Sequence, residues 1–149
     1  MRILFLSVIA FSGGVCLAVQ AGFNSQLGVL LKKPIFASVA TSISSISFAL
    51  LFILFSQKEK LDWHITKNVR WYLWFIGGLF SIVGITLYYY TIPKVGIANV
   101  ISLGLCGQLI FSVIASYYGW FDIVPESISF KKITGILLLT ISVFLINSK

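Results

Sequence analysis

The polar side chains best placed to do chemistry in this sequence are neutral amides that interrupt long apolar runs. Gln20 and Asn24 are four residues apart, so on a helix they share one face, about 40° apart. Two amides in lipid are costly unless they meet a hydrogen-bond partner or a wet cavity. Interhelical hydrogen bonding and the lining of a cavity are therefore the two interpretations of this pair. Gln26 points roughly 120° away from Gln20, which favours an interfacial position for it.

A further amide, Gln108, lies in a later apolar run. Gly96, Val100, Gly104 and Gln108 follow one another at a spacing of four, which places them on one stripe of a helix. Small residues on such a stripe let the backbone of a neighbouring helix approach closely. Asn99 lies half a rotation away from Gln108, so on a straight helix these two amides cannot line the same cavity. We predict Gln108, rather than Asn99, as a cavity-lining residue.

A tyrosine cluster ends the run between these two segments. The predicted substrate contacts in it are Tyr88 and Tyr89, because aromatic rings can form a wall around a solute or hold a cation without a carboxylate. An aromatic belt at the membrane surface is the other interpretation. Small residues predicted to serve helix packing are Gly77, Ser81, Gly84, Gly104 and Gly107. A small-residue packing face is also expected where hydroxyls gather in an earlier run, at Ser38, Thr41, Ser42, Ser44, Ser45 and Ser47.

Ionisable groups are missing from these runs. Glu59, Asp62, His64, Asp122 and Glu126 all lie between the runs or at their edges. Proton relays and cation exchangers usually keep a carboxylate at membrane depth, so that mechanism is disfavoured. No carboxylate pair, histidine cluster, nucleophile elbow or phosphate-binding loop appears, which disfavours an enzyme and predicts no cofactor.

The two cysteines carry no sign of a metal site or a disulfide framework. Cys16 and Cys106 lie in separate apolar runs, and neither has a second cysteine close in sequence. We expect buried, reduced thiols and no bound metal.

These residues are positioned by what the composition indicates is an all-α membrane protein. Of 149 residues, 58% are hydrophobic and 10% charged, with a mean hydropathy of +1.01. A soluble domain carries roughly 25% charged residues, so lipid must be the main solvent and partner. A single domain, 1–149, is expected with five transmembrane helices at about 3–31, 35–57, 71–92, 95–121 and 130–148.

The net charge of +7 comes from cations between the apolar runs. This position indicates that the cations anchor the helix ends at the lipid headgroups and do not form a nucleic-acid-binding surface.

The cations also bear on orientation. With five spans, the side of the amino terminus carries seven of them, at Arg2, Lys58, Lys60, Lys67, Arg70, Lys131 and Lys132. The other side carries four, at Lys32, Lys33, Lys94 and Lys149. This favours a cytoplasmic amino terminus, but the bias is weak enough to permit insertion in both orientations.

The order of the short motifs resembles the YdcZ-like family of small membrane proteins, within the drug/metabolite transporter (EamA-like) superfamily. The motifs are QAGFNSQLG, Pro34, GG at 77–78, PKVGIA, GQLIFS, YYGW and FKKITGILLLT. Gln20 and Asn24 match the family's Q-x-x-x-N, and Gly107 with Gln108 matches its GQ. The sequence departs where the family commonly has an acidic residue, here Ser116, and where it has a glycine, here Ser45.

The resemblance implies half of a ten-helix drug/metabolite transporter with an inverted-repeat architecture, in the bacterial inner membrane. One five-helix copy must then obtain its second half from another chain, as an antiparallel homodimer or as a heterodimer with a related subunit. The implied function is alternating-access transport of a small polar or aromatic metabolite or drug-like solute, with Gln20, Asn24, Gln108 and Tyr88 or Tyr89 lining the site.

Two alternatives to transport of such a solute stay open at this point. A non-transporting membrane interaction subunit would use the small-residue stripes to bind another membrane protein. A flippase for lipid-linked carriers would need basic residues at headgroup depth, for which Lys32, Lys33, Lys131 and Lys132 are the candidates.

Overall fold

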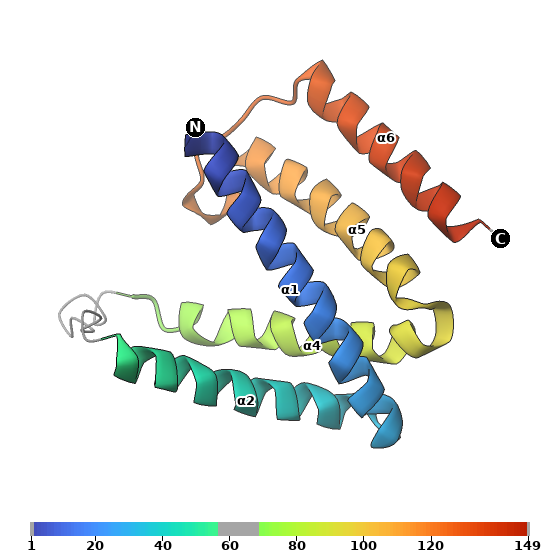
Figure 1. The fold of residues 1–149 in the computed structure, drawn as a ribbon. Coiled ribbons are helices and arrows are strands. Elements are labelled where there is room, and N and C mark those ends of the chain that lie inside the picture. The colour runs from blue at the N-terminus through green and yellow to red at the C-terminus, as the bar shows by residue number, and fades with distance from the viewer. Residues whose placement is uncertain (1, 57–68, 149) are drawn as a thin grey trace. The chain divides into compact units, whose positions relative to one another are not determined.

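The computed structural model describes residues 2–56 and 69–148, which form an all-helical protein with no strand in these two ranges (Figure 1). The long helices are α1 (Arg2–Leu30), α2 (Pro34–Phe55), α4 (Leu73–Val95), α5 (Ile97–Tyr118) and α6 (Phe130–Asn147), and a short 3-10 helix, η1 (Trp120–Asp122), follows α5. In this part of the chain, five helices are long and apolar enough to cross a membrane. The prediction of an all-α membrane protein with five such helices is confirmed.

The helix ends follow from local backbone chemistry. After α1, Lys32 adopts a left-handed conformation with φ of 55°, and Pro34 then opens α2. Proline suits the first turn of a helix because its missing N–H has no partner there in any case. We expected the third span to stop at residue 92, but α4 continues through Pro93 to Val95. The fourth stops earlier than expected, because Gly119 turns left-handed with φ of 65° and caps α5.

The chain divides into two compact units, Met1–Lys94 and Val95–Lys149. The first unit contains α1, α2 and α4, and the second contains α5, η1 and α6. That all five helices form one domain, equivalent to half of a ten-helix transporter, stays a prediction. The segment with Glu59, Asp62 and His64 lies outside the described residues.

Small residues build the core of the first unit, where the carboxyl-terminal parts of α1 and α4 meet the amino-terminal part of α2. We call this region the three-helix junction. Its buried members are Ala21, Ser25 and Gly28 of α1, Ala37, Ser38 and Thr41 of α2, and Tyr89 and Ile92 of α4. A Cβ at Gly28 would lie 3.4 Å from Pro34 Cα and 3.6 Å from Ala37 Cβ. The absence of a side chain at this position therefore lets α1 and α2 approach closely.

The second unit is held by a seam between α5 and α6. The buried residues of these two helices are Val100 and Ala115 of α5 and Val143 of α6. Polar contacts join the same two helices: Asn147 Nδ2 donates to Ser102 Oγ at 3.3 Å, and Cys106 Sγ lies 3.7 Å from Thr140 Oγ1. Such interhelical contacts are expected of membrane helices, because polar side chains in a membrane form hydrogen bonds with adjacent helices.

The cysteine prediction is wrong about the burial of Cys16. Both thiols are free in the described structure, and Cys106 is half-buried beside Thr140. Cys16, however, is exposed on α1. The physical reason is that the buried residues of α1 all lie in its carboxyl-terminal part, so Cys16 faces no packed helix within its own unit.

Candidate functional site

A hydroxyl network ties α2 to α4 inside the three-helix junction. Ser38 Oγ lies 2.7 Å from Thr86 Oγ1, and Thr41 Oγ1 lies 3.3 Å from Tyr89 Oη. Thr41 also donates to the carbonyl of Ala37 at 2.8 Å. Each of these hydroxyls therefore has a partner without water, which is the condition for polar groups at membrane depth.

Tyr89, one of the predicted substrate contacts, belongs to this network. Its side chain is only 2% exposed, and its Cβ is 3.8 Å from the position a Cβ would take at Gly28. The structure therefore gives Tyr89 a packing role between all three helices of the unit. Tyr88, its neighbour, is half-buried and lies outside the buried set. Contact of either ring with a substrate stays a prediction.

Gln20 and Asn24 lie on α1 at the edge of the buried face formed by Ala21 and Ser25, and both are half-buried. Ser25 is satisfied locally, since its hydroxyl donates to the carbonyl of Gly22 at 2.9 Å. Within the described residues, the side-chain amides of Gln20 and Asn24 form no hydrogen bond to the protein. The interhelical bonding that was one interpretation of this pair is thus not provided inside the first unit.

The depth of this amide pair follows from helix geometry. With a rise of 1.5 Å per residue, Gln20 lies about 15 Å, and Asn24 about 9 Å, from the end of α1 at Leu30. The hydrocarbon core is about 30 Å thick. If Leu30 marks one edge of that core, Gln20 lies close to its middle.

Gln108 is exposed on α5, in the second unit. Asn99 already has a local partner, because its amide donates to the carbonyl of Val95, the last residue of α4, at 2.7 Å. Gln108 has no such side-chain bond in the part of the chain that the structure describes. A site shared by Gln108 and the α1 amides stays a prediction, because the two units are described separately.

The small-residue stripe of α4 has no helix against it in its own unit. Gly77, Ser81 and Gly84 are exposed, and a Cβ built at either glycine meets nothing within 4 Å. The same holds for Gly107 of α5, whereas Gly104 is half-buried. The predicted packing role of Gly77, Ser81, Gly84 and Gly107 is therefore not fulfilled by the helices of their own units.

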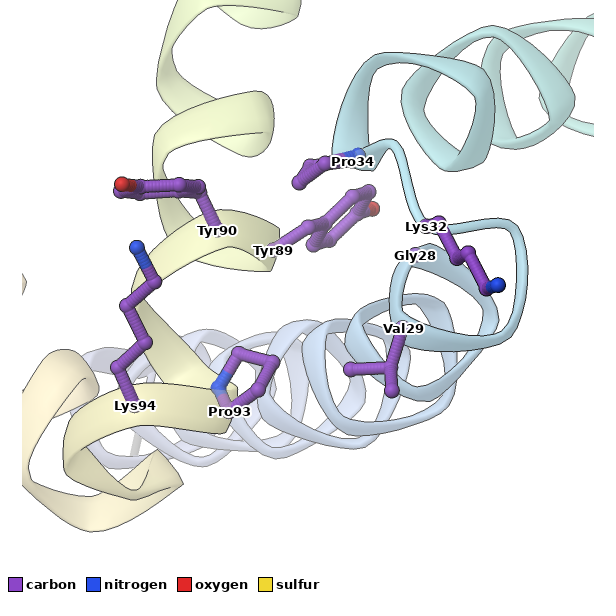
Figure 2. A pocket seen from close by; sticks show the side chains of 8 residues that line it. All are labelled: Gly28, Val29, Lys32, Pro34, Tyr89, Tyr90, Pro93 and Lys94. Atoms are coloured by element: carbon purple, nitrogen blue, oxygen red, sulfur yellow. The ribbon is translucent and has the colours of Figure 1, made fainter.

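A pocket of about 210 Å³ opens beside the three-helix junction, at the carboxyl ends of α1 and α4 (Figure 2). It is lined by Gly28, Val29, Lys32 and Pro34 from the α1–α2 hairpin and by Tyr89, Tyr90, Pro93 and Lys94 from α4. The ammonium group of Lys94 lies 3.2 Å from the centre of the Tyr90 ring, a cation–π contact.

Charged residues in the five spanning helices occur only in first and last turns, at Arg2, Lys94, Lys131 and Lys132. The described residues contain no carboxylate inside a spanning helix and no group of three or more potential metal ligands. Glu126, in the loop before α6, pairs with Lys132 in the first turn of α6. The hydrogen bond and the charge of that lysine hold the pKa of the Glu126 carboxyl below its usual value.

Thr86 is the site residue that sequence reasoning missed. Ser38 and Thr41 were expected only as small packing residues, yet both bond to α4. A usable signal exists: Thr86 and Tyr89 have the same spacing of three as Ser38 and Thr41, so each pair presents two hydroxyls on one face.

Comparison with known proteins identifies the family to which the chain belongs. The family model described as "Putative inner membrane exporter, YdcZ" matches residues 5–145, nearly the whole chain. No curated protein and no solved structure matches the chain. The match agrees with the five apolar helices and with the resemblance of the sequence motifs. The chain is a multi-pass inner membrane protein and belongs to the YdcZ family of drug/metabolite transporters.

Proposed function

We propose that this protein exports a small polar or aromatic solute by alternating access, with Gln20 and Asn24 of α1 as solute-binding residues. The observation that carries the proposal is the contrast between these amides and the hydroxyls near them. Ser25, Ser38, Thr41 and Thr86 all have protein partners, whereas the two amides have none in the described structure. Amides held near the middle of the membrane need a partner that is not their own unit, and a transported solute supplies one.

The neutral amide groups of the proposed site indicate which class of solute it binds. Amide groups donate and accept hydrogen bonds but carry no charge, so they recognise polar or zwitterionic groups and do not attract a bare cation. Since no carboxylate lies inside the five described spanning helices, a carrier driven by the gradient of its own solute fits better than a proton antiporter.

The second half of the transporter comes, in this proposal, from another copy of the chain or from a related subunit in the opposite orientation. Gln108 is the third solute-binding amide in this proposal. Inverted repeats provide the two mirror-related conformations that alternating access needs. A reporter fused to the carboxyl terminus tests this: signal on both sides of the membrane supports an antiparallel homodimer. Signal on one side, with no related subunit in the purified complex, contradicts both dimers.

The transport proposal is tested by solute flux in proteoliposomes, with a broad panel of polar and aromatic metabolites. Gln20→Leu and Asn24→Leu should each lower the flux about tenfold, the loss expected from one hydrogen bond to a solute. Gln26→Leu is the matched control, because it removes the same amide from an exposed position of the same helix. If Gln26→Leu lowers flux as much as Gln20→Leu, the assignment of the site is wrong.

A second candidate function rests on the open stripe of Gly77, Ser81 and Gly84. A face of small residues with no helix against it in its own unit fits a membrane partner, and the protein would then be an interaction subunit. Stoichiometric co-purification with another membrane protein, combined with no flux for any solute of the panel, would favour this function over transport.

A further inference from the structure

We infer that the pocket beside the three-helix junction binds a phosphate group through Lys32 and Lys94, at the level of the lipid headgroups. This inference does not depend on the proposed transport function, because it concerns a separate place in the fold. The pocket lies at the carboxyl ends of α1 and α4, whereas the amides proposed to bind the solute lie deeper along α1.

The position of the pocket at the ends of two helices determines its depth in the membrane. Lys32 directly follows α1, and Lys94 is the penultimate residue of α4. Both helices are long enough to cross the membrane, so the pocket they share lies at the end of two spans, where hydrocarbon gives way to headgroups. Lysines here keep their ammonium groups in the polar layer while their stems cover apolar surface.

The charge balance at the pocket favours an anion. Lys32 and Lys94 flank it on two sides (Figure 2), and its lining contains no carboxylate. Within the first unit, two helices end here and one begins, which adds a partial charge of roughly −0.5 for each carboxyl end and +0.5 for the amino end of α2. The sum is roughly +1.5, so the lysines exceed what is needed to balance the helix dipoles.

Neither lysine has an acidic partner among the residues that the structure describes. The ammonium group of Lys94 faces the ring of Tyr90, and no ion pair involves Lys32 or Lys94 among residues 2–56 and 69–148. A cation–π contact at an exposed site is weak, and the flexible lysine stem can turn its ammonium group toward a ligand.

The volume of the pocket and its apolar lining further restrict the class of ligand that it can bind. Val29, Pro34 and Pro93 provide apolar surface between the two lysines. A volume of about 210 Å³ is below the roughly 300 Å³ at which pockets begin to enclose drug-sized ligands. The pocket therefore fits a small anionic group with an apolar attachment, as in the phosphate and glycerol of an anionic phospholipid.

The test uses the full chain in dodecyl maltoside micelles, titrated with dioctanoyl phosphatidylglycerol in a calorimeter. Each basic residue near an anionic headgroup contributes enough to change affinity about fivefold. Lys32→Gln and Lys94→Gln should each weaken binding about fivefold, and the double variant about 25-fold. Lys33→Gln is the matched control, since it removes the adjacent lysine, which does not line the pocket. Helix content and elution volume of each variant check that it is folded.

Two further probes identify the source of the phosphate. If sodium phosphate displaces phosphatidylglycerol, and this also depends on Lys32 and Lys94, the pocket accepts phosphate from a free solute. If it does not, the lipid is the ligand; both results support the inference. The inference is overturned if Lys33→Gln weakens binding as much as Lys32→Gln. It is also overturned if zwitterionic dioctanoyl phosphatidylcholine binds as tightly as phosphatidylglycerol.

Discussion

Replacing Tyr89 by alanine is the sharpest test of how the first unit is built. This side chain is almost fully buried between α1, α2 and α4, and its hydroxyl bonds to Thr41. We expect Tyr89→Ala to destabilise the unit strongly and Tyr89→Phe to destabilise it only slightly. The two variants separate the packing of the ring from the hydrogen bond of the hydroxyl.

The magnitudes follow from the contacts. An interhelical hydrogen bond in a membrane is worth about 0.6 kcal/mol, and Thr41 keeps its bond to the carbonyl of Ala37 when the tyrosine hydroxyl is lost. Tyr89→Phe should therefore cost about 0.6 kcal/mol of unfolding free energy. Tyr89→Ala leaves in addition a cavity of roughly 100 Å³, which at roughly 24 cal/mol per Å³ costs about 2.4 kcal/mol. The expected total for alanine is about 3 kcal/mol.

The assay is reversible unfolding in mixed micelles with increasing dodecyl sulfate, followed by circular dichroism. Phe80→Ala is the control, because it removes a ring that is 71% exposed on the same helix and should change the unfolding free energy by less than about 0.5 kcal/mol. If Tyr89→Ala unfolds like the wild type but abolishes transport, the packing role is refuted. Tyr89 would then be the solute contact expected from the sequence.

Three further predictions concern the turn after α5, the ion pair before α6 and the hydroxyl pair between α2 and α4. Gly119→Ala should destabilise the second unit by about 2 kcal/mol in the same unfolding assay, because it strains a left-handed residue whose Cβ would also press on a proline ring. Lys132→Gln should raise the pKa of Glu126 toward its usual value, measured by carboxyl NMR. Since the paired carboxyl has a lowered pKa, the pair stabilises the fold above the unfolded-state pKa, and this contribution is lost as the pH falls through the lower folded-state value. A double-mutant cycle of Ser38→Ala and Thr86→Val should give a coupling of about 0.6 kcal/mol, and at most about 1.7 kcal/mol.

Each of these predictions has a matched control. Gly135→Ala lies in open space on α6, so equal losses for Gly119→Ala and Gly135→Ala would contradict the strain argument. Lys131→Gln should leave the titration of Glu126 unchanged, because Lys132 is its ion-pair partner. A cycle of Thr86→Val with Ser47→Ala, which is exposed on α2, should show no coupling. A coupling as large as that of Ser38 would refute the specific hydroxyl pair.

The helices could be predicted from sequence because lipid imposes one simple requirement on length and hydrophobicity. Lys32, Lys33 and Pro34 end the first run, and α1 ends at Leu30 as those residues suggest. The predicted end of the fourth span, at residue 121, lies beyond the end of α5 at Tyr118. Trp120 and Phe121 continue the apolar run after Gly119 has already left the helical conformation.

The packing faces could not be predicted in the same way. In a membrane the outer surface is as apolar as the interior, so hydrophobicity does not tell which side of a helix is packed. Gly77 and Gly28 are both glycines within apolar runs, yet Gly28 lies against α2 whereas Gly77 faces open space in its unit. Likewise, Tyr88 and Tyr89 differ in burial although they are adjacent in sequence. Only the three-dimensional neighbours distinguish the members of each pair.

The short connection between α1 and α2 has a mechanical consequence. Three residues, 31–33, join these helices, and an extended segment of that length spans only about 10 Å. The close approach at Gly28 lies directly beside it. The joined ends therefore act as a pivot. In any conformational cycle of this unit, the separation of α1 from α2 must be largest at their free ends, near Ile3 and Phe55, and smallest beside Lys32.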